Sequence, residues 1–404
     1  MQLVEQHVIK RNDPRFAVID AAAFKSKNLY NAALYEARQS YIHKEKYLNY
    51  NEMDKHMQPH EAYKALPAKV SQQVLKQLHE VWTSYFEACA AYRENPEKFL
   101  GHPKIPKYKH KVEGRNLLVY TIQALSQPAL KDGLIRPSQL PITIKTEQRQ
   151  VQQVRIVPKI GHYVVEVVYA KQIQPANVDP AFYAGLDPGV TNLAAIASNK
   201  EGFIPRIVNG RPLKAWNQWY NMRIAELKHK DGTDYFTRQM EHVTNKRNWR
   251  IEHYLHTASR RIIDLLVAEG IGTLFIGKNL FWKQHVNHGK TNNQNFVCIP
   301  HARFIEMLTY KAELVGITVI TTEESYTSKA SFLDLDELPV YNPNREQEPI
   351  FSGKRVKRGL YRSKSGQTIN ADTNGAYNTI RKCRPDAFAK GVAGYVVHPI
   401  RLPV

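Results

Sequence analysis

Acidic residues occur at three separate places in this sequence where carboxylates could be brought together. Asp187 follows one apolar run and precedes a Pro-Gly turn and a second apolar run, in the segment GLDPGVTNLAAIA. This pattern predicts two strands, with the carboxylate at the end of the first strand and facing a cleft. An aspartate in such a place is about as often an ordinary β-turn residue. The motif alone therefore leaves both roles open.

The other two acidic positions lie in the last quarter of the chain. Asp372 stands near the front of NADTNGAYNTIRK, a segment rich in small residues that can pack closely against a sheet. An aspartate in the first turn of a helix is more often a cap or a partner of the helix dipole. Glu323 and Glu324 end an apolar strand over 317–322, and glutamates at a strand end more often form a solvated rim. Each position thus has a purely structural alternative.

Taken together, the three positions would provide a set of hard oxygen ligands. Two aspartates and a glutamate on separate elements are the ligands that Mg²⁺ or Mn²⁺ prefers. Two such ions about 3.5–4 Å apart can activate a water molecule and stabilise the leaving oxygen of a phosphodiester. The combination predicts metal-dependent phosphodiester hydrolysis more strongly than any one of the three motifs.

The elements that must position these residues fall into successive blocks. Residues 1–13 could form one strand, and 14–97 carry apolar residues at spacings of three and four, which indicates helices. From 103 to 178 the pattern changes to short alternating strands. Beyond a linker, strands alternate with helices, which is typical of a mixed sheet covered by helices. The 404 residues suffice for two or three domains.

Charge narrows the class of partner. Lys and Arg outnumber Asp and Glu by 57 to 37, which gives a net charge of +20. Such an excess indicates a polyanionic partner, either nucleic acid or an anionic membrane. No uninterrupted apolar stretch approaches the roughly 20 residues needed to span a bilayer, and the first residues lack the apolar run of a signal peptide. We therefore expect a cytoplasmic, nucleoid-associated protein without a membrane partner.

Two basic segments could contact phosphates. The first, 103–111, alternates basic residues around one aromatic ring, which suits phosphate contacts beside a stacked base; its candidate residues are Lys104, Lys107, Tyr108 and Lys109. The second, 354–364, holds six basic residues, Arg358 among them, and no acid. Either segment could instead be a solvated loop. Only three cysteines occur, at positions 89, 298 and 383, so no zinc site or disulfide framework is expected.

The order of these motifs resembles a known family. GLDPGVTNLAAIA resembles the first RuvC motif of TnpB, the RNA-guided nuclease of insertion sequences that is related to type V CRISPR effectors. NADTNGAYNTIRK resembles the third RuvC motif of that family, and ESYTSKASF resembles its TSK segment. HPKIPKYKHK is similar to the family's entry into a β-barrel. The resemblance covers nearly the whole chain.

This resemblance implies an α+β multidomain fold. A β-barrel (wedge) domain would comprise 1–13 and 103–178, and a helical recognition domain would comprise 14–102. An RNase H-like (RuvC) α/β nuclease domain would follow over 179–404, with a cysteine-free insertion at about 329–369. The implied function is an RNA-guided DNA endonuclease encoded by a transposable element. Its partners would be a guide RNA from the element's flank and target double-stranded DNA with a short flanking motif.

The resemblance also assigns roles to single residues. Asp187, Glu324 and Asp372 would be catalytic and would hold Mg²⁺ or Mn²⁺. Tyr326 and Lys329 of the TSK segment would contact nucleic acid, together with the basic residues named above, Arg358 included. An RNA-independent transposase or resolvase ranks lowest, because nothing in the chain resembles a separate DNA-joining domain.

The sequence departs from the family pattern at two places. Family members usually carry a catalytic glutamate directly after the strand that here ends at Ile276, whereas this chain continues with Gly277. Either the protein binds DNA under RNA guidance without cutting it, as a transcriptional repressor would, or Glu324 on the adjoining strand replaces the missing acid. We expect the second, and we expect Glu323 to point to the opposite face of the strand.

The second departure concerns the zinc ribbon that family members place after the TSK segment. The corresponding stretch, 329–369, contains no CxxC pair. We expect it to become ordered only on nucleic acid or to be held by its apolar side chains, which are Phe332, Leu333, Leu335, Leu338, Val340, Tyr341 and Phe351.

Overall fold

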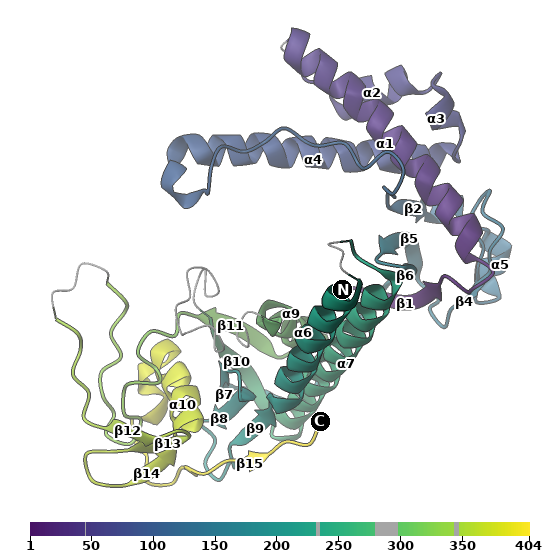
Figure 1. Cartoon of the computed structure of the whole chain (residues 1–404). Coiled ribbons are helices and arrows are strands. Elements are labelled where there is room, and N and C mark those ends of the chain that lie inside the picture. Colours follow the sequence, from purple (N-terminus) through teal and green to yellow (C-terminus); the bar gives the residue numbers. More distant parts are fainter. Residues whose placement is uncertain (45, 232–234, 279–297, 343–346) are drawn as a thin grey trace. The chain divides into compact units, whose positions relative to one another are not determined.

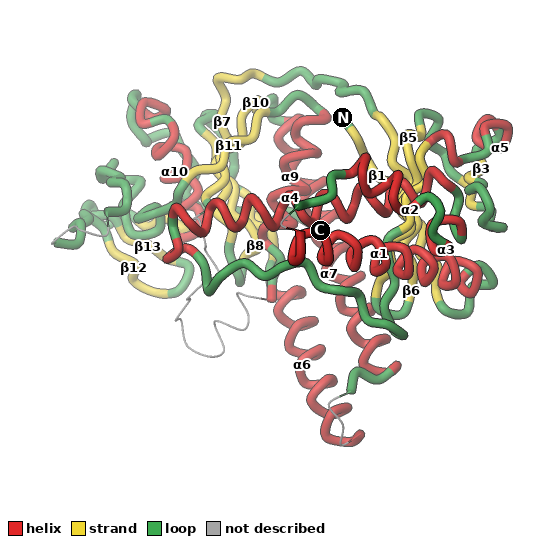
Figure 2. The backbone as a smooth tube through the Cα atoms, turned by 90° about the horizontal axis from the view of Figure 1, so that it is seen from above, coloured by secondary structure: helices red, strands yellow, loops and turns green. Residues whose placement is uncertain are grey.

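The chain forms two compact units, Met1–Lys171 and Gln172–Val404, in a computed structural model (Figures 1 and 2). The structure describes residues 1–44, 46–231, 235–278, 298–342 and 347–404. No helix within these ranges is long and apolar enough to cross a membrane. Each unit is described by itself below.

A four-stranded antiparallel sheet in the order β1-β6-β5-β2 forms the base of the first unit. Its strands are β1 (Gln2–Lys10), β2 (Leu118–Thr121), β5 (Val151–Lys159) and β6 (His162–Ala170). A separate pair joins β3 (Leu134–Ile135) to β4 (Ile144–Lys145). The predicted strand near the N-terminus and the alternating strands after 103 are thus confirmed. Among the described strands no pairing joins β1 to β2, so hydrogen bonds do not close this sheet into the predicted barrel.

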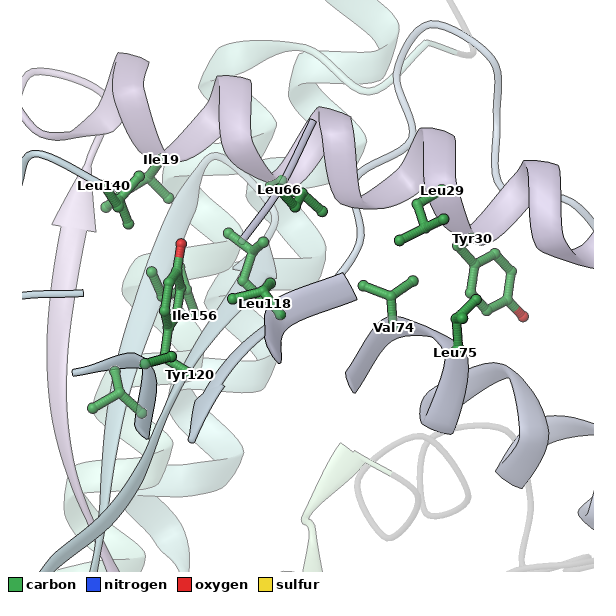
Figure 3. Packing of buried hydrophobic residues seen from close by; sticks show 14 of the residues in the cluster. Ile19, Leu29, Tyr30, Leu66, Val74, Leu75, Leu118, Tyr120, Leu140 and Ile156 are labelled. Carbon is green, nitrogen blue, oxygen red and sulfur yellow. The ribbon is translucent and has the colours of Figure 1, made fainter. Parts of the chain in front are cut away.

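Helices cover this sheet. Their bounds are α1 (Phe16–Lys44), α2 (Tyr50–Met57), α3 (Glu61–Lys64), α4 (Ala68–Glu94) and α5 (Gln127–Lys131). The apolar residues at helical spacing in α1 and α4 face inward and share one hydrophobic core with the sheet. Figure 3 shows part of this core, with Ile19, Leu29, Tyr30, Val74, Leu75, Leu118, Tyr120 and Ile156 among its members. The helical block and the strands therefore fold together as one unit.

The second unit contains a six-stranded sheet in the order β11-β10-β7-β8-β9-β15. The strands β7 (Asp179–Pro188), β8 (Asn192–Ser198) and β9 (Arg206–Asn209) are antiparallel neighbours. On the other side of β7, β10 (Ile271–Gly277) and β11 (Thr318–Thr322) run parallel to it. The edge strand β15 (Ile400–Arg401) runs parallel to β9. Two crossovers through helices therefore place the ends of β7, β10 and β11 at one edge of the sheet.

Helices cover both faces of this sheet, as the α/β pattern predicted. The helices α6 (Arg211–Asp231), α7 (Arg238–Ala268) and α9 (His301–Leu314) lie on one side, and α10 (Ala371–Cys383) lies on the other (Figure 1). Successive side chains of β8 point to opposite faces of the sheet and contribute to the hydrophobic core on each face. Ala194 and Ile196 pack with α7 and α9, whereas Ala195 and Ala197 pack with α10.

Close packing of α10 on β7 requires glycine at two positions. A Cβ atom at Gly185 of β7 would lie 2.1 Å from the backbone oxygen of Ala376. A Cβ atom at Gly375 of α10 would lie 2.6 Å from Oδ2 of Asp187. Both distances are far below van der Waals contact, so only glycine lets the helix approach the strand this closely. The small residues of NADTNGAYNTIRK thus bring the start of α10 next to Asp187.

The insertion after β11 contains a three-stranded antiparallel sheet of β12 (Lys354–Lys357), β13 (Leu360–Arg362) and β14 (Thr368–Asn370). Phe332 anchors it by stacking on Tyr377 of α10 with ring centroids 4.2 Å apart. Tyr361 is buried, and its hydroxyl donates to the backbone oxygen of Lys329 at 2.7 Å.

Apolar packing holds the insertion only in part. Of the predicted anchors Phe332 is fully buried, whereas Leu335, Val340 and Tyr341 are exposed. Hydrogen bonds contribute more than the sequence suggested, since the Asp336 carboxylate accepts from the backbone amides of Ser331 and Ser352 at 2.8 and 3.0 Å. The expectation that all seven apolar side chains hold the segment was therefore wrong for these three.

Candidate active site

Asp187 lies near the end of β7, opposite Ala195 of β8, and is partly buried. Burial raises the pKa of its carboxyl well above the usual value, and the negative charges of Glu324 and Asp372 raise it further. The Arg355 guanidinium acts in the opposite direction on the pKa of Asp187. Glu324 and Asp372 therefore both lie close enough to Asp187 for their charges to act on it.

Asp372 is the second residue of α10, but the cap of this helix is another residue. The side chain of Asn370 accepts hydrogen bonds from the backbone amides of Asp372 and Thr373 at 3.0 and 3.1 Å. Asp372 is thereby free of the capping role that its position suggested. Its Oδ2 accepts instead from Nδ2 of Asn192 at 2.7 Å, and its Oδ1 lies 3.7 Å from the guanidinium of Arg355.

Glu323 and Glu324 have different surroundings; that they point to opposite faces of the strand stays a prediction. Glu323 forms an ion pair with Lys382, whose side chain is only 6% exposed, and accepts from the backbone amide of Ser325 at 2.6 Å. Burial raises the pKa of Glu323, but these hydrogen bonds and the charge of Lys382 together outweigh burial and lower that pKa. Burial, and then the charge of Glu323, raise the pKa of Glu324 to about 7. Glu323 is thus a structural anchor.

The Glu324 side chain lies over Gly277. β10 and β11 are parallel neighbours, with Gly277 opposite Thr322. A Cβ atom built at Gly277 would lie 3.1 Å from Oε2 and 3.2 Å from Cβ of Glu324. A side chain at position 277 would therefore start in the space that Glu324 fills.

The donor chemistry of these acids fits a divalent cation. The three carboxylates come from separate elements, and burial and like charge raise the pKa of Asp187. A positive ion would offset that repulsion. As they stand, the described residues contain no group of three or more His, Cys, Asp or Glu side chains that could hold a metal ion. The acids therefore form a loose cluster, and metal binding stays a prediction.

A cavity of about 1020 Å³ opens above the two aspartates. Asp187 and Asp372 line it together with basic side chains from α6, from the β12–β13 hairpin and from β15, namely Arg211, Lys214, Arg355, Arg358 and Arg401. Glu324 is not among the residues that line it. The cavity thus combines an acidic floor with basic walls, and such a distribution attracts a polyanion.

Two asparagines of α10 that sequence reasoning missed hold the TSK segment. Nδ2 of Asn374 donates to the backbone oxygen of Ala330 at 2.8 Å, and Nδ2 of Asn378 donates to those of Thr327 and Ala330 at 2.9 and 2.8 Å. Both side chains are buried. Their spacing of four residues, which places them on one helix face, was the available signal.

The remaining predicted residues of this unit differ in their surroundings. Tyr326 has a φ angle of +66° and packs near the ring of Phe351. The Lys329 ammonium lies 2.9 Å from Glu348. Arg358 alone among the three lines the cavity, and it donates to the hydroxyl of Thr191 at 2.8 Å. Their contacts with nucleic acid stay predictions.

The predicted nucleic-acid-binding residues of the first unit also differ in their exposure and contacts. Lys104, Lys107 and Tyr108 are exposed, and the guanidinium of Arg38 lies 5.0 Å from the Tyr108 ring centroid. The half-buried Lys109 instead lies over the ring of Tyr30, and burial lowers its pKa. Lys109 thus has a packing role in addition to any contact with phosphate.

We expect substitution of Lys104 or Lys107 by alanine to weaken binding of RNA by a salt-dependent amount. Each lost phosphate contact should lower the slope of log K against log salt by about 0.7–0.9. Fluorescence anisotropy over a salt series measures this slope. Glu113→Gln, in the neighbouring exposed turn, is the control. Unchanged slopes in the Lys104→Ala/Lys107→Ala double variant would make the segment a solvated loop.

Comparison with known proteins assigns two successive parts of the chain. Residues 162–282 match the OrfB_IS605 family, described as a probable transposase, and residues 301–379 match the Cas12f1-like TNB domain. The TnpB-like protein ORF457 of Acidianus two-tailed virus is 24% identical over 94% of this chain and 84% of its own length.

Solved structures give weaker likenesses. A Cas12f1 in complex with sgRNA and target DNA covers 93% of this chain and 98% of its own, at 15% identity and a TM-score of 0.37. The mini-RNA-guided endonuclease Cas_phi3 covers 94% and 92%, at 9% identity and a TM-score of 0.44.

The two family matches contain all three acids of the site. Asp187 falls in the first match, and Glu324 and Asp372 fall in the second. The viral relative extends the likeness along nearly the whole chain, the first unit included. Together, the two family matches and the viral relative support the TnpB family for this chain.

Proposed function

We propose that the protein is an RNA-guided DNA endonuclease of a transposable element that hydrolyses phosphodiester bonds at a RuvC-like site. One observation carries this proposal. Asp187, Glu324 and Asp372 come from β7, from the segment after β11 and from α10, and the charges of the other two acids act on Asp187. Asp187 and Asp372 line a cavity with basic walls. Carboxylates whose pKa is raised by burial and by neighbouring negative charges are typical of a catalytic site.

The sheet supports an RNase H-like domain. Its first three strands are antiparallel neighbours, and the next two run parallel to the first strand on its other side. This is the strand order expected of that fold. Acids at the end of the first strand, after the fifth strand and on the following helix then reach one edge of the sheet.

Different residues of this chain would bind the metal ion, orient its ligands and bind the phosphates. Asp187, Glu324 and Asp372 would hold Mg²⁺ or Mn²⁺, which when bound activates water and stabilises the leaving oxygen. Asn192 holds one oxygen of Asp372 and so orients the carboxylate. The basic walls would bind the phosphates on either side of the bond to be cut.

The first unit would hold the guide RNA and its duplex with the target. Its exposed lysines and the net charge of +20 favour nucleic-acid partners. In RNA-guided effectors base pairing reads the sequence, while the protein reads duplex shape and a short flanking motif. The wedge and recognition roles proposed for 1–13, 14–102 and 103–178 rest on this division.

A nuclease-inactive, RNA-guided DNA-binding protein is the second candidate. The glycine at position 277, where the family usually carries a glutamate, favours it. Such a protein would repress transcription by occupying its target. The geometry of Glu324 favours the nuclease instead, because this side chain fills the space over Gly277.

Cleavage of a plasmid by the protein with its co-purified RNA tests the proposal. We expect cutting in Mg²⁺ or Mn²⁺, and EDTA should abolish it while the melting temperature of the RNA complex stays nearly unchanged, since hard carboxylate ligands would hold a catalytic rather than a structural ion. A large destabilisation by EDTA would indicate a structural metal. Guided binding without any cutting in either metal would support the repressor.

A further inference from the structure

One hairpin of the insertion contacts two elements of the site, namely α10 at Asp372 and the loop that follows Asp187. β12 and β13 pair antiparallel, and Arg358 lies in the turn between them. Arg355 of β12 places its guanidinium 3.7 Å from Oδ1 of Asp372. Arg358 donates to the hydroxyl of Thr191, in the loop that follows Asp187. The hairpin therefore reaches α10 with one arginine and the β7–β8 loop with the other.

The opposite wall of the cavity is the start of α6. Arg211, Lys214 and Gln218 line it at spacings of three and four residues, which places them on one face of the helix. With Arg355, Arg358 and Arg401, five cationic side chains surround two carboxylates. Five positive charges are more than the two carboxylates neutralise, and such an excess is suited to a chain of phosphates.

We propose that Arg355 changes partner, from Asp372 to a phosphate, when the DNA strand to be cut enters this cavity. In the unloaded protein Arg355 pairs with Asp372, and both side chains line the cavity. When a strand enters, Arg355 and Arg358 turn to its phosphates, and Asp372 becomes available to a cation. This inference rests on the proposed nuclease function.

The contacts are weak enough for such an exchange. The side chains of Arg355 and Asp372 are 51% and 33% exposed, and a single ion pair of this length and exposure contributes little to stability. A phosphate can accept two parallel hydrogen bonds from one guanidinium and binds it more strongly. The incoming strand would therefore displace Asp372 from Arg355 at little cost.

Two ligands measured separately on the full-length protein test the exchange. In the absence of nucleic acid, Mn²⁺ binding is followed by electron paramagnetic resonance. We expect Mn²⁺ to bind R355Q about two- to fivefold more tightly than wild type, because a weak competitor for Asp372 is lost. R358Q should bind Mn²⁺ as wild type does, since Arg358 contacts a hydroxyl.

Binding of a fluorescent single-stranded oligonucleotide over a salt series, in EDTA, is the second measurement. R355Q and R358Q should each bind more weakly and lower the salt slope by about 0.7. R362Q is the matched control, because Arg362 belongs to β13 of the same hairpin, is exposed and does not line the cavity. Opposite effects of R355Q on metal and on DNA would not arise from a merely structural role.

The outcomes separate this inference from the proposed function. If R355Q and R358Q bind the oligonucleotide as R362Q does, the cavity is not the strand site, even if the wild type cuts DNA. If R355Q leaves the affinity for Mn²⁺ unchanged, Arg355 does not compete for Asp372 and the exchange is wrong. If the wild type binds no Mn²⁺, the proposed metal site fails, while the oligonucleotide series still decides whether the cavity binds a strand.

Discussion

Glu324→Gln should abolish target cleavage, by at least about 100-fold, while guided binding of target DNA persists. The charge stabilisation that a bound metal provides amounts to several kcal/mol, and each loss of about 1.4 kcal/mol is tenfold in rate. Glutamine keeps the volume of the side chain over Gly277 and removes only the charge. Asp187→Asn should reduce cleavage to a similar degree. Plasmid cleavage and an electrophoretic mobility shift on the same preparations provide the two readouts.

The neighbouring glutamate is the matched control. Glu323→Gln weakens the ion pair with the nearly buried Lys382, so its main effect should be a lower melting temperature. Cleavage at a temperature well below melting should remain close to that of the wild type. The reverse pattern, with cutting lost in Glu323→Gln and kept in Glu324→Gln, would transfer the catalytic role to Glu323.

The pH dependence of the free energy of unfolding shows whether Glu324→Gln loses cleavage through its chemistry or through unfolding. In the folded protein the pKa of Glu324 lies at about 7, above the ordinary 4.5, so between these values the folded state keeps a proton that the unfolded state has lost. The free energy of unfolding therefore falls as the pH rises through this window, and the full penalty applies above about 7. Glutamine carries no such penalty. Without added metal, Glu324→Gln should be at least as stable as the wild type at pH 8.

Periodicity predicted β8 and β10 and the helices α7 and α9 of the second unit, because these strands are buried and each of these helices has one buried apolar face. The strand before Asp187 and the small-residue helix at Asp372 both occur as expected. The role of Asp372 was ambiguous in the sequence, since a first-turn aspartate can cap a helix. The structure removes that ambiguity because Asn370 fills the cap.

Other features depend on contacts between distant segments and have no local signal. The Asn192 bond to Asp372 and the pairing of Arg355 with the same carboxylate join residues that are far apart in the chain. Lys109 was grouped with Lys104 and Lys107 by spacing, yet it packs over Tyr30 of α1. Apolar residues alone do not account for how the insertion is held, because hydrogen bonds from the backbone amides of Ser331 and Ser352 to Asp336 also hold it.

An exchange of the residues at positions 277 and 324 tests whether Glu324 replaces the glutamate that the family usually carries at 277. A Cβ atom at 277 would lie 3.2 Å from Cβ of Glu324, so the two side chains start from adjacent points in one space. Glu324→Gly should be inactive. Gly277→Glu alone should also lose activity and stability, because a second carboxylate is forced against the first.

Combined, the two changes should restore cleavage to at least tenfold above Glu324→Gly, since a glutamate at 277 then fills the space that Glu324 vacates. Two variants that are each harmful alone and rescue one another reveal direct coupling. The control is Gly277→Gln with Glu324→Gly, which restores the volume without the charge and should stay inactive. If the exchanged protein melts normally and binds its target, yet cuts no better than this control, the space over Gly277 is not where the second acid acts.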